Sequence, residues 1–225
     1  MMSFYSENPR FYVAVDCIIF GLADGRLCLL LTKRDFEPEK GKWSVMGGFV
    51  QTGESVDDAA RRVLKSLTGL ENVYMEQVHA FGEVDRDPGE RVISIAYYAL
   101  LGPEEYDLRL LEQHHAVWMP LDALPELGFD HPAMVARALG RIRRQFSTMP
   151  IGFNLLPELF TLTQLQTLYE TILGEPVDKR NFRKRISETG CIEKTDLIDK
   201  TGSRRGASLY RFNVGKYSPE SKFKI

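Results

Sequence analysis

Residues 48–70 read GFVQTGESVDDAARRVLKSLTGL and predict one amphipathic helix with a marked beginning and end. Ser55 can cap the first turn, with Asp58 three residues later as a variant of the capping box. Gly69 suits the left-handed residue that follows a last turn. Apolar side chains recur at the helical spacing of a buried stripe: Val56, Ala59, Ala60, Val63, Leu64 and Leu67. Periodicity alone therefore indicates a core helix.

The same stretch resembles the Nudix box, G-x5-E-x7-R-E-U-x-E-E-x-G-U, in which U is a bulky apolar residue. The positions that match that pattern are Gly48, Glu54, Arg62, Leu64, Gly69 and Leu70. The preceding stretch GKWSVMGGFVQTGES, residues 41–55, is similar to the strand and loop that lead into the box. The resemblance implies an α+β fold of the Nudix type, an α/β/α sandwich.

The box lacks the three glutamates that should follow its arginine, because their positions hold Val63, Ser66 and Leu67. In the family, carboxylates on one helix face converge on Mg²⁺, which neutralises a diphosphate and orients the attacking water. Valine and leucine offer no metal ligand, so we expect no metal, no cofactor and no hydrolysis. The alternative is an active Mg²⁺-dependent hydrolase of nucleoside diphosphate derivatives that takes ligands from elsewhere, such as Glu83 or Glu90.

Composition and cysteine usage indicate the cellular compartment of the chain. The chain has 225 residues, of which 44% are apolar, as in ordinary globular proteins. No apolar run approaches the ~20 residues that span a bilayer, and the first residues lack the pattern of a signal peptide. The three cysteines are an odd number without paired spacing, and Cys17 and Cys28 lie in apolar runs. We therefore expect a reducing cytoplasm, no membrane and no zinc site.

Strands and helices are mixed along the first two thirds of the chain, which favours an α+β sandwich. The expected strands cover residues 11–20, 26–34, 43–50, 73–84, 92–101 and 117–119, with a turn at Gly47-Gly48, and a helix covers 131–146. The Pro- and Gly-containing stretch STMPIGF, residues 147–153, then predicts a boundary. We divide the chain into a ligand-binding domain, residues 1–148, and a second domain, residues 149–225.

The second domain has the character of a winged helix-turn-helix. Residues 151–225 carry 13 basic and 9 acidic side chains, whereas residues 1–150 carry 16 and 22. An amphipathic helix, LTQLQTLYETIL (162–173), is followed by the turn GEPV and by a basic helix that Asp178 caps. Residues 191–197 and 207–214 then predict a hairpin, the wing.

The expected DNA contacts are the polar and basic side chains of these elements. They are Thr163, Lys179, Arg180, Asn181, Arg183 and Lys184 on the helices and Lys200, Ser203, Arg204 and Arg205 in the wing. Basic side chains would contact phosphates, and asparagine or arginine can pair with base edges. The alternative is a merely solvated basic face; the order of helix, turn, basic helix and basic hairpin argues against it.

The whole chain resembles the Nudix-related transcriptional regulators of bacteria, above all in FTLTQLQTLYETILGEPVDKRNFRKRI (160–186) and the later SLYRF. That resemblance implies a homodimer that binds a double-stranded DNA operator and a small effector without hydrolysing it. One branch of the family senses ADP-ribose and another senses L-arabinose. Residues 73–100 and 151–170 look closer to the second branch, so L-arabinose is our first expectation and ADP-ribose our second.

The expected ligand-binding residues are polar, aromatic or glycine residues on strands and loops. They are Asp16, Lys33, Arg34, Trp43, Gly47, Gly48, Glu54, Asp85 and Tyr97. A neutral pentose needs convergent hydrogen-bonding groups over an apolar floor, whereas ADP-ribose needs charge for its diphosphate. The structural alternatives stay open: Trp43 and Tyr97 as core residues, and Asp85 as the ion-pair partner of Arg86.

Overall fold

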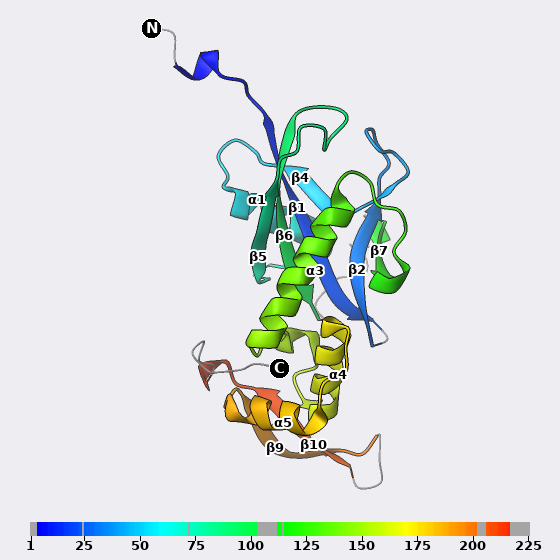
Figure 1. The fold of residues 1–225 in the computed structure, drawn as a ribbon, viewed down its shortest axis with the longest axis vertical. Helices are drawn as coiled ribbons and strands as arrows, with labels where there is room; N and C mark the ends of the chain where they lie inside the picture. The colour runs from blue at the N-terminus through cyan, green and yellow to red at the C-terminus, as the bar shows by residue number, and fades with distance from the viewer. Residues whose placement is uncertain are drawn as a thin grey trace.

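A mixed seven-stranded sheet with a helix on each face forms the larger part of the molecule (Figure 1). The computed structural model describes residues 4–23, 25–71, 73–102, 112–113, 115–201 and 206–216. In Figure 1, α3 (His131–Thr148) crosses the front of the sheet and points down to a smaller domain, while α1 (Val56–Thr68) lies behind it. The expected α+β class, a sheet with helices followed by a smaller domain, is confirmed.

Strand β1 is the axis of the large sheet. The strands are β1 (Tyr12–Ala23), β2 (Arg26–Lys33), β3 (Trp43–Ser44), β4 (Met46–Phe49), β5 (Met75–Phe81), β6 (Val92–Leu101) and β7 (Ala116–Pro120). Their order is β3-β2-β1-β6-β5, with β4 paired to β1 and β7 to β2. β1 and β6 run parallel, with Cys17 opposite Tyr97. Because side chains alternate along both strands, each strand supplies one set of residues to each face.

The box helix α1 forms as its sequence predicts. The Ser55 hydroxyl accepts a hydrogen bond from the Asp58 amide at 3.1 Å, and Gly69 has φ 75°. Val63 and Leu64 are buried against the sheet. The side chain of Leu67 lies outside the described residues. Capping and apolar periodicity therefore predicted this helix and its buried face correctly.

The smaller domain is a winged helix. Its elements are β8 (Phe160–Thr161), α4 (Leu162–Leu173), α5 (Lys179–Glu188), β9 (Ile192–Asp199) and β10 (Ala207–Phe212); short 3-10 turns elsewhere are Phe4–Glu7, Leu121–Ala123, Phe153–Leu155 and Val214–Lys216. Thr161 caps α4 in a capping box with Gln164, and Asp178 caps α5. The three strands are ordered β8-β10-β9. Phe182 and Ile186 are buried beneath α5, as their spacing predicts.

The connection between the two domains is packed rather than loose. The Phe146 ring at the end of α3 contacts the Tyr169 ring of α4 at 5.0 Å between centroids. The Arg143 side chain donates to the Ile172 carbonyl at 2.9 Å. Gly152 has φ 81°, and the Phe146 ring occupies the space that a Cβ there would need. One apolar core therefore runs from the sheet into α4 and α5.

Several expected elements differ in detail. Gly47 and Gly48 lie inside β4, paired with Asp16 and Val15 of β1, so the expected turn at this point is wrong. The strand expected over residues 73–84 is limited to β5, and the helix expected over 131–146 extends to Thr148. No helix in the described ranges combines the length and apolarity needed to cross a membrane.

Candidate functional site

A pocket of about 630 Å³ opens at one end of the sheet, on the face that α3 covers. Its lining comes mainly from β1, β2, the loop after β2, β4, the loop between β5 and β6, and the start of α3. Five expected ligand residues line it: Asp16, Lys33, Arg34, Gly47 and Gly48. Further lining residues are Phe36, Arg86, Asp87, His115, Phe129 and His131.

A buried cluster of charged side chains forms one wall of this pocket. Arg86 donates two hydrogen bonds to the Asp130 carboxylate, at 2.9 and 2.7 Å, and lies 3.6 Å from Asp16. Asp16 also accepts a hydrogen bond from the Ser94 hydroxyl at 2.5 Å. His131 Nε2 lies 3.7 Å from the other Asp16 oxygen. Because each charge here faces an opposite charge or a hydrogen bond, the cluster can remain buried.

Burial sets the protonation of the histidine in this wall. Desolvation lowers the pKa of His131 below its ordinary value, although the Asp16 and Asp130 carboxylates oppose the shift. Its Nδ1 lies 3.4 Å from the Ser44 hydroxyl, which donates to the Val45 carbonyl. Burial therefore favours the neutral form of the ring, and Arg86 is the guanidinium that faces the two carboxylates of the wall.

Arg34 provides a second cation, held between two aromatic rings. Its guanidinium lies 4.3 Å from the Phe36 ring centroid and 4.8 Å from that of Phe129. Its Nε donates to the Pro38 carbonyl at 2.9 Å. Burial lowers the pKa of Arg34, opposed by Asp87 and Asp16, yet arginine stays charged in proteins. Stacking and one hydrogen bond thus fix the direction of the group while its charge remains at the pocket.

Lack of space beside Asp16 explains why β4 carries glycine at position 47. A Cβ at Gly47 would lie 2.3 Å from an Asp16 carboxylate oxygen. Asp16 and Gly47 are direct partners in the β1–β4 pairing. Only glycine leaves room for that carboxylate, so the residue serves the charged wall and not a turn.

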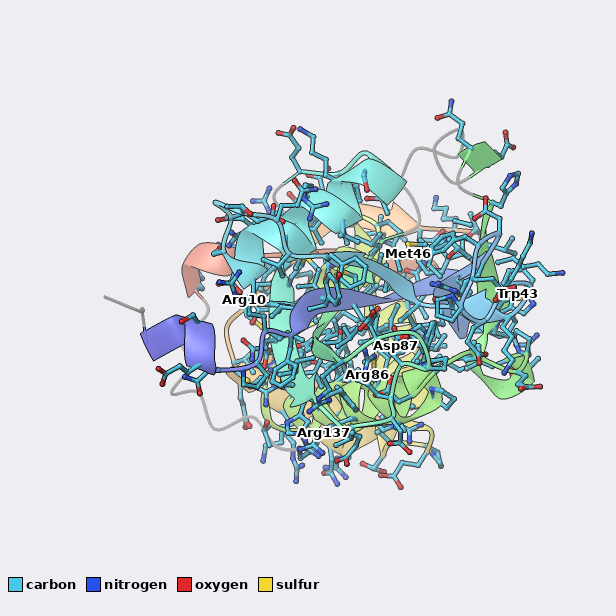
Figure 2. All side chains as sticks on the ribbon, turned by 90° about the horizontal axis from the view of Figure 1, so that it is seen from above. Arg10, Trp43, Met46, Arg86, Asp87 and Arg137 are labelled. Carbon is cyan, nitrogen blue, oxygen red and sulfur yellow. The ribbon has the colours of Figure 1, made fainter. Side chains whose placement is uncertain are left out.

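The other four expected ligand residues do not line the pocket. Tyr97 faces α1 on the opposite side of the sheet, where its hydroxyl donates to Asp57. Trp43 packs against the apolar core and lies at the right-hand edge of Figure 2, away from the Arg86 label near the middle. The Glu54 carboxylate is held by Arg62, and Asp85 makes no ion pair with Arg86, which bonds Asp130 instead.

The side chains of the box residues contact other parts of the protein and have structural roles. Arg62 donates to Glu54 at 2.7 and 3.0 Å and to the Phe49 carbonyl at 3.0 Å, which ties the preceding loop to α1. The hydrogen bond from Arg62 lowers the pKa of Glu54. Val63 belongs to the core, and the Ser66 hydroxyl donates to the Val63 carbonyl. Within the part of the chain that the structure describes, no three possible metal ligands gather.

The basic helix α5 presents most of the expected DNA contacts to solvent. Lys179, Arg180, Asn181 and Lys184 are exposed, as is Lys200 at the end of β9. Arg183 differs from expectation because it is partly buried, and it donates to the Thr163 hydroxyl of α4 at 3.3 Å. That bond brings two expected DNA residues together at the start of α4. Ser203, Arg204 and Arg205 lie outside the described residues.

Comparison with known proteins matches both domains. The model of the NUDIX domain family covers residues 10–138, and that of the NrtR DNA-binding winged helix domain covers residues 152–212. The chain is 36% identical over 216 residues to the "ADPR responsive transcriptional repressor NtrR" of Acinetobacter baylyi, covering 94% of this chain and 86% of the relative. The chain belongs to the NrtR family.

Solved and curated relatives extend that result. The crystal structure of Shewanella oneidensis NrtR complexed with a 27mer DNA has a TM-score of 0.83 and 27% identity, over 94% of this NrtR-family chain and 97% of that chain. The ADP-ribose pyrophosphatase of Methanocaldococcus jannaschii is 33% identical over 131 residues, 57% of this chain and 76% of the relative. The NrtR-family organisation therefore covers nearly the whole chain, whereas the likeness to a pyrophosphatase is limited to part of it.

Sequence reasoning missed several residues of the pocket in this NrtR-family chain. Arg86 and His131 lie 45 positions apart in sequence, and neither belongs to a recognised pattern. Phe36 and Phe129 both lie against Arg34 only because two separate loops bring their rings to its guanidinium. Buried ion pairs between loops depend on the tertiary fold, so periodicity offered no signal for them. The two charged residues Arg86 and Asp87, adjacent in a Pro- and Gly-containing loop, were the nearest available hint.

Proposed function

We propose that this chain is a ligand-responsive transcriptional regulator. In this proposal residues 1–148 bind an effector, and residues 149–225 bind operator DNA through α5 and the wing as part of a homodimer. The observation that carries it is membership of the NrtR family over both domains, since a relative bears the name of a transcriptional repressor and a solved relative holds DNA. Two-fold operators mirror two-fold proteins, which supports the dimer.

ADP-ribose is the effector that this proposal favours, ahead of the L-arabinose expected from sequence. The relative of Acinetobacter baylyi is named as responsive to ADPR, and none of the relatives reported above supports L-arabinose. Lys33, Arg34 and Arg86 line the pocket, and cations of this kind match a diphosphate. A neutral pentose would gain little from them.

The proposal includes binding without hydrolysis. The support is that Val63 fills the core at a box position where catalysis needs a carboxylate, while Glu54 is held by Arg62. Incubation of the chain with ADP-ribose and Mg²⁺ should yield no AMP. Turnover that requires Mg²⁺ and disappears in Glu54→Gln would establish the hydrolase alternative instead.

Fluorescence anisotropy on DNA from directly upstream of the protein's own gene tests the main proposal. The full chain should bind this fragment in the presence of excess unrelated DNA, and ADP-ribose should change the affinity while L-arabinose should not. Absence of specific binding would refute the proposal that the chain regulates this promoter. A response to L-arabinose alone would restore the first expectation from sequence.

Salt dependence tests whether α5 supplies the DNA contacts. Arg180→Ala should weaken binding to all DNA sequences similarly and reduce the slope of log affinity against log salt by about 1, because one phosphate contact is lost. Lys40→Ala provides the control, since Lys40 is also an exposed cation but lies on the other domain. Equal losses in both variants would argue against α5 as the DNA-binding helix.

Light scattering at the same protein concentration measures whether a dimer is present.

A further inference from the structure

Arg86 connects the ligand pocket to the helix that reaches the DNA-binding domain. We infer that Arg86 binds an anionic, diphosphate-type ligand, that it exchanges Asp130 for the ligand as its partner, and that α3 carries this exchange to α4. The inference rests on the proposed function, because it assumes that the pocket binds such a ligand. Arg86 then recognises the ligand, and its release of Asp130 is transmitted along α3.

The resident partner of Arg86, Asp130, lies at the N-cap, directly before the first residue of α3. Asp130 stands at the N-cap, where an aspartate would ordinarily bond a backbone amide of the first turn. Its side chain makes no capping bond and instead accepts both hydrogen bonds from Arg86. This ion pair therefore ties the N-terminus of the helix to the β5–β6 loop.

A phosphate oxygen is a direct competitor for that ion pair. Arginine binds carboxylates and phosphates through the same two-pronged geometry, so a diphosphate in the pocket offers Arg86 an equivalent partner. Arg86 lines the pocket wall, close to Asp87 near the middle of the view in Figure 2. Asp16 keeps the Ser94 hydroxyl as a donor when Arg86 moves. The exchange therefore leaves Asp130, at 21% side-chain exposure, to be satisfied by solvent or by the α3 amides.

The far half of α3 is tied to α4 by a hydrogen bond and a ring contact. Arg143 bonds the Ile172 carbonyl, and the Phe146 ring packs on Tyr169. Tyr169 in turn contacts Phe182 of α5, with 5.1 Å between ring centroids. Figure 1 shows α3 as one continuous helix from the sheet to α4, and its 18 residues span about 27 Å. A small displacement at its first turn is thereby delivered to the helix pair that carries the DNA contacts.

The test uses the full chain with ADP-ribose as probe and inorganic pyrophosphate as a second anion. Calorimetry gives the affinity, and amide hydrogen exchange reports on α3, α4 and α5. Arg86→Lys should lower ADP-ribose affinity about tenfold, because lysine lacks the two-pronged geometry. Asp130→Asn should raise the affinity by about threefold or more, because the competing charge is removed and asparagine still suits an N-cap. Pyrophosphate should follow the same order.

Arg91→Lys is the matched control, since Arg91 follows the same loop but donates to the Gly82 and Glu83 carbonyls. Its affinity should stay within about twofold of the parent chain. In the parent chain, ADP-ribose should change exchange at the first turn of α3 and in α4. Asp130→Asn should show part of that change without ligand.

The outcomes separate the inference from the proposed function. If the parent chain binds neither ADP-ribose nor pyrophosphate, the proposed ligand class is wrong. If it binds ADP-ribose while Arg86→Lys and Asp130→Asn behave like Arg91→Lys, Arg86 is not the anion-binding residue. If the affinities change as expected but exchange in α4 does not respond, recognition by Arg86 stands and transmission by α3 is refuted.

Discussion

The two faces of the central sheet meet their helices in opposite ways. On one face α1 packs through a buried apolar cluster that includes Val15, Ala60 and Val63. On the other face α3 covers an apolar core that ends in the charged wall of Asp16, Arg86 and Asp130. The box that resembles an enzyme's signature lies on α1, yet the buried charges lie against α3. The contrast teaches that a motif can persist as scaffold while the polar chemistry of the domain gathers on the opposite face.

Restoring a glutamate on the α1 face should have the largest effect. Val63 is 3% exposed, so Val63→Glu places an uncompensated carboxylate in the core. We expect a loss of about 4 kcal/mol or more in the free energy of unfolding, without any gain of Mg²⁺-dependent turnover. Urea denaturation and an ADP-ribose hydrolysis assay measure the two.

Ser66→Glu is the control for that change, because Ser66 is another box position but is exposed. It should alter the free energy of unfolding by about 0.5 kcal/mol or less. A stable Val63→Glu protein that hydrolyses ADP-ribose would mean that the α1 face remains a catalytic scaffold.

Removing the cation from the α3 face should come second. Arg86→Met leaves Asp16 and Asp130 without their shared partner and should cost about 3 kcal/mol, the lower end for a broken buried pair, because Asp130 is partly solvated. Urea denaturation of Arg86→Met and of Arg91→Met measures the difference. Adding Asp130→Asn to Arg86→Met should recover part of the loss; no recovery would show that the two side chains are not energetically coupled.

Two adjacent tyrosines allow the two faces of the sheet to be tested separately, with smaller expected changes in stability. Tyr97 donates to Asp57 on the α1 side, whereas Tyr98 bonds Glu76 and Gln145 on the α3 side. Tyr97→Phe and Tyr98→Phe should each lower the free energy of unfolding by about 1 kcal/mol, since each loses hydrogen bonding but little volume. Under the inference above, Tyr98→Phe should weaken the ADP-ribose effect on α4 exchange and Tyr97→Phe should not. If both variants changed the ADP-ribose effect on α4 exchange equally, the signal would not be specific to the α3 face of the sheet.

The smallest expected effect is a pH dependence confined to the α3 face. Burial lowers the folded-state pKa of His131, so the unfolded chain binds its proton first as the pH falls. Stability is therefore lost as the pH drops through the ordinary histidine range. Between roughly pH 7.5 and 5.5, the parent chain should lose more thermal stability than His131→Gln. The opposite order would mean that Asp16 and Asp130 outweigh desolvation.

Local patterns in the sequence determined the elements and their order. Capping residues and apolar spacing specified α1, and Thr161 and Asp178 specified where α4 and α5 begin. The same patterns, with the resemblance to known families, indicated the Nudix sandwich and the winged helix. These features depend on residues a few positions apart, and such interactions can be read from the chain directly.

Only the tertiary structure decided which side chains meet. Asp16 and Tyr97 lie on neighbouring strands, yet the alternation of side chains and the parallel register send them to opposite faces. Arg86 reaches Asp130, 44 residues later, because the β5–β6 loop folds over the start of α3. Sequence periodicity predicts which face of an element is buried, but the partner on that face is set by the packing of distant segments. For that reason five of the nine expected ligand residues line the pocket, while Arg86, on which its charged wall depends, was not among them.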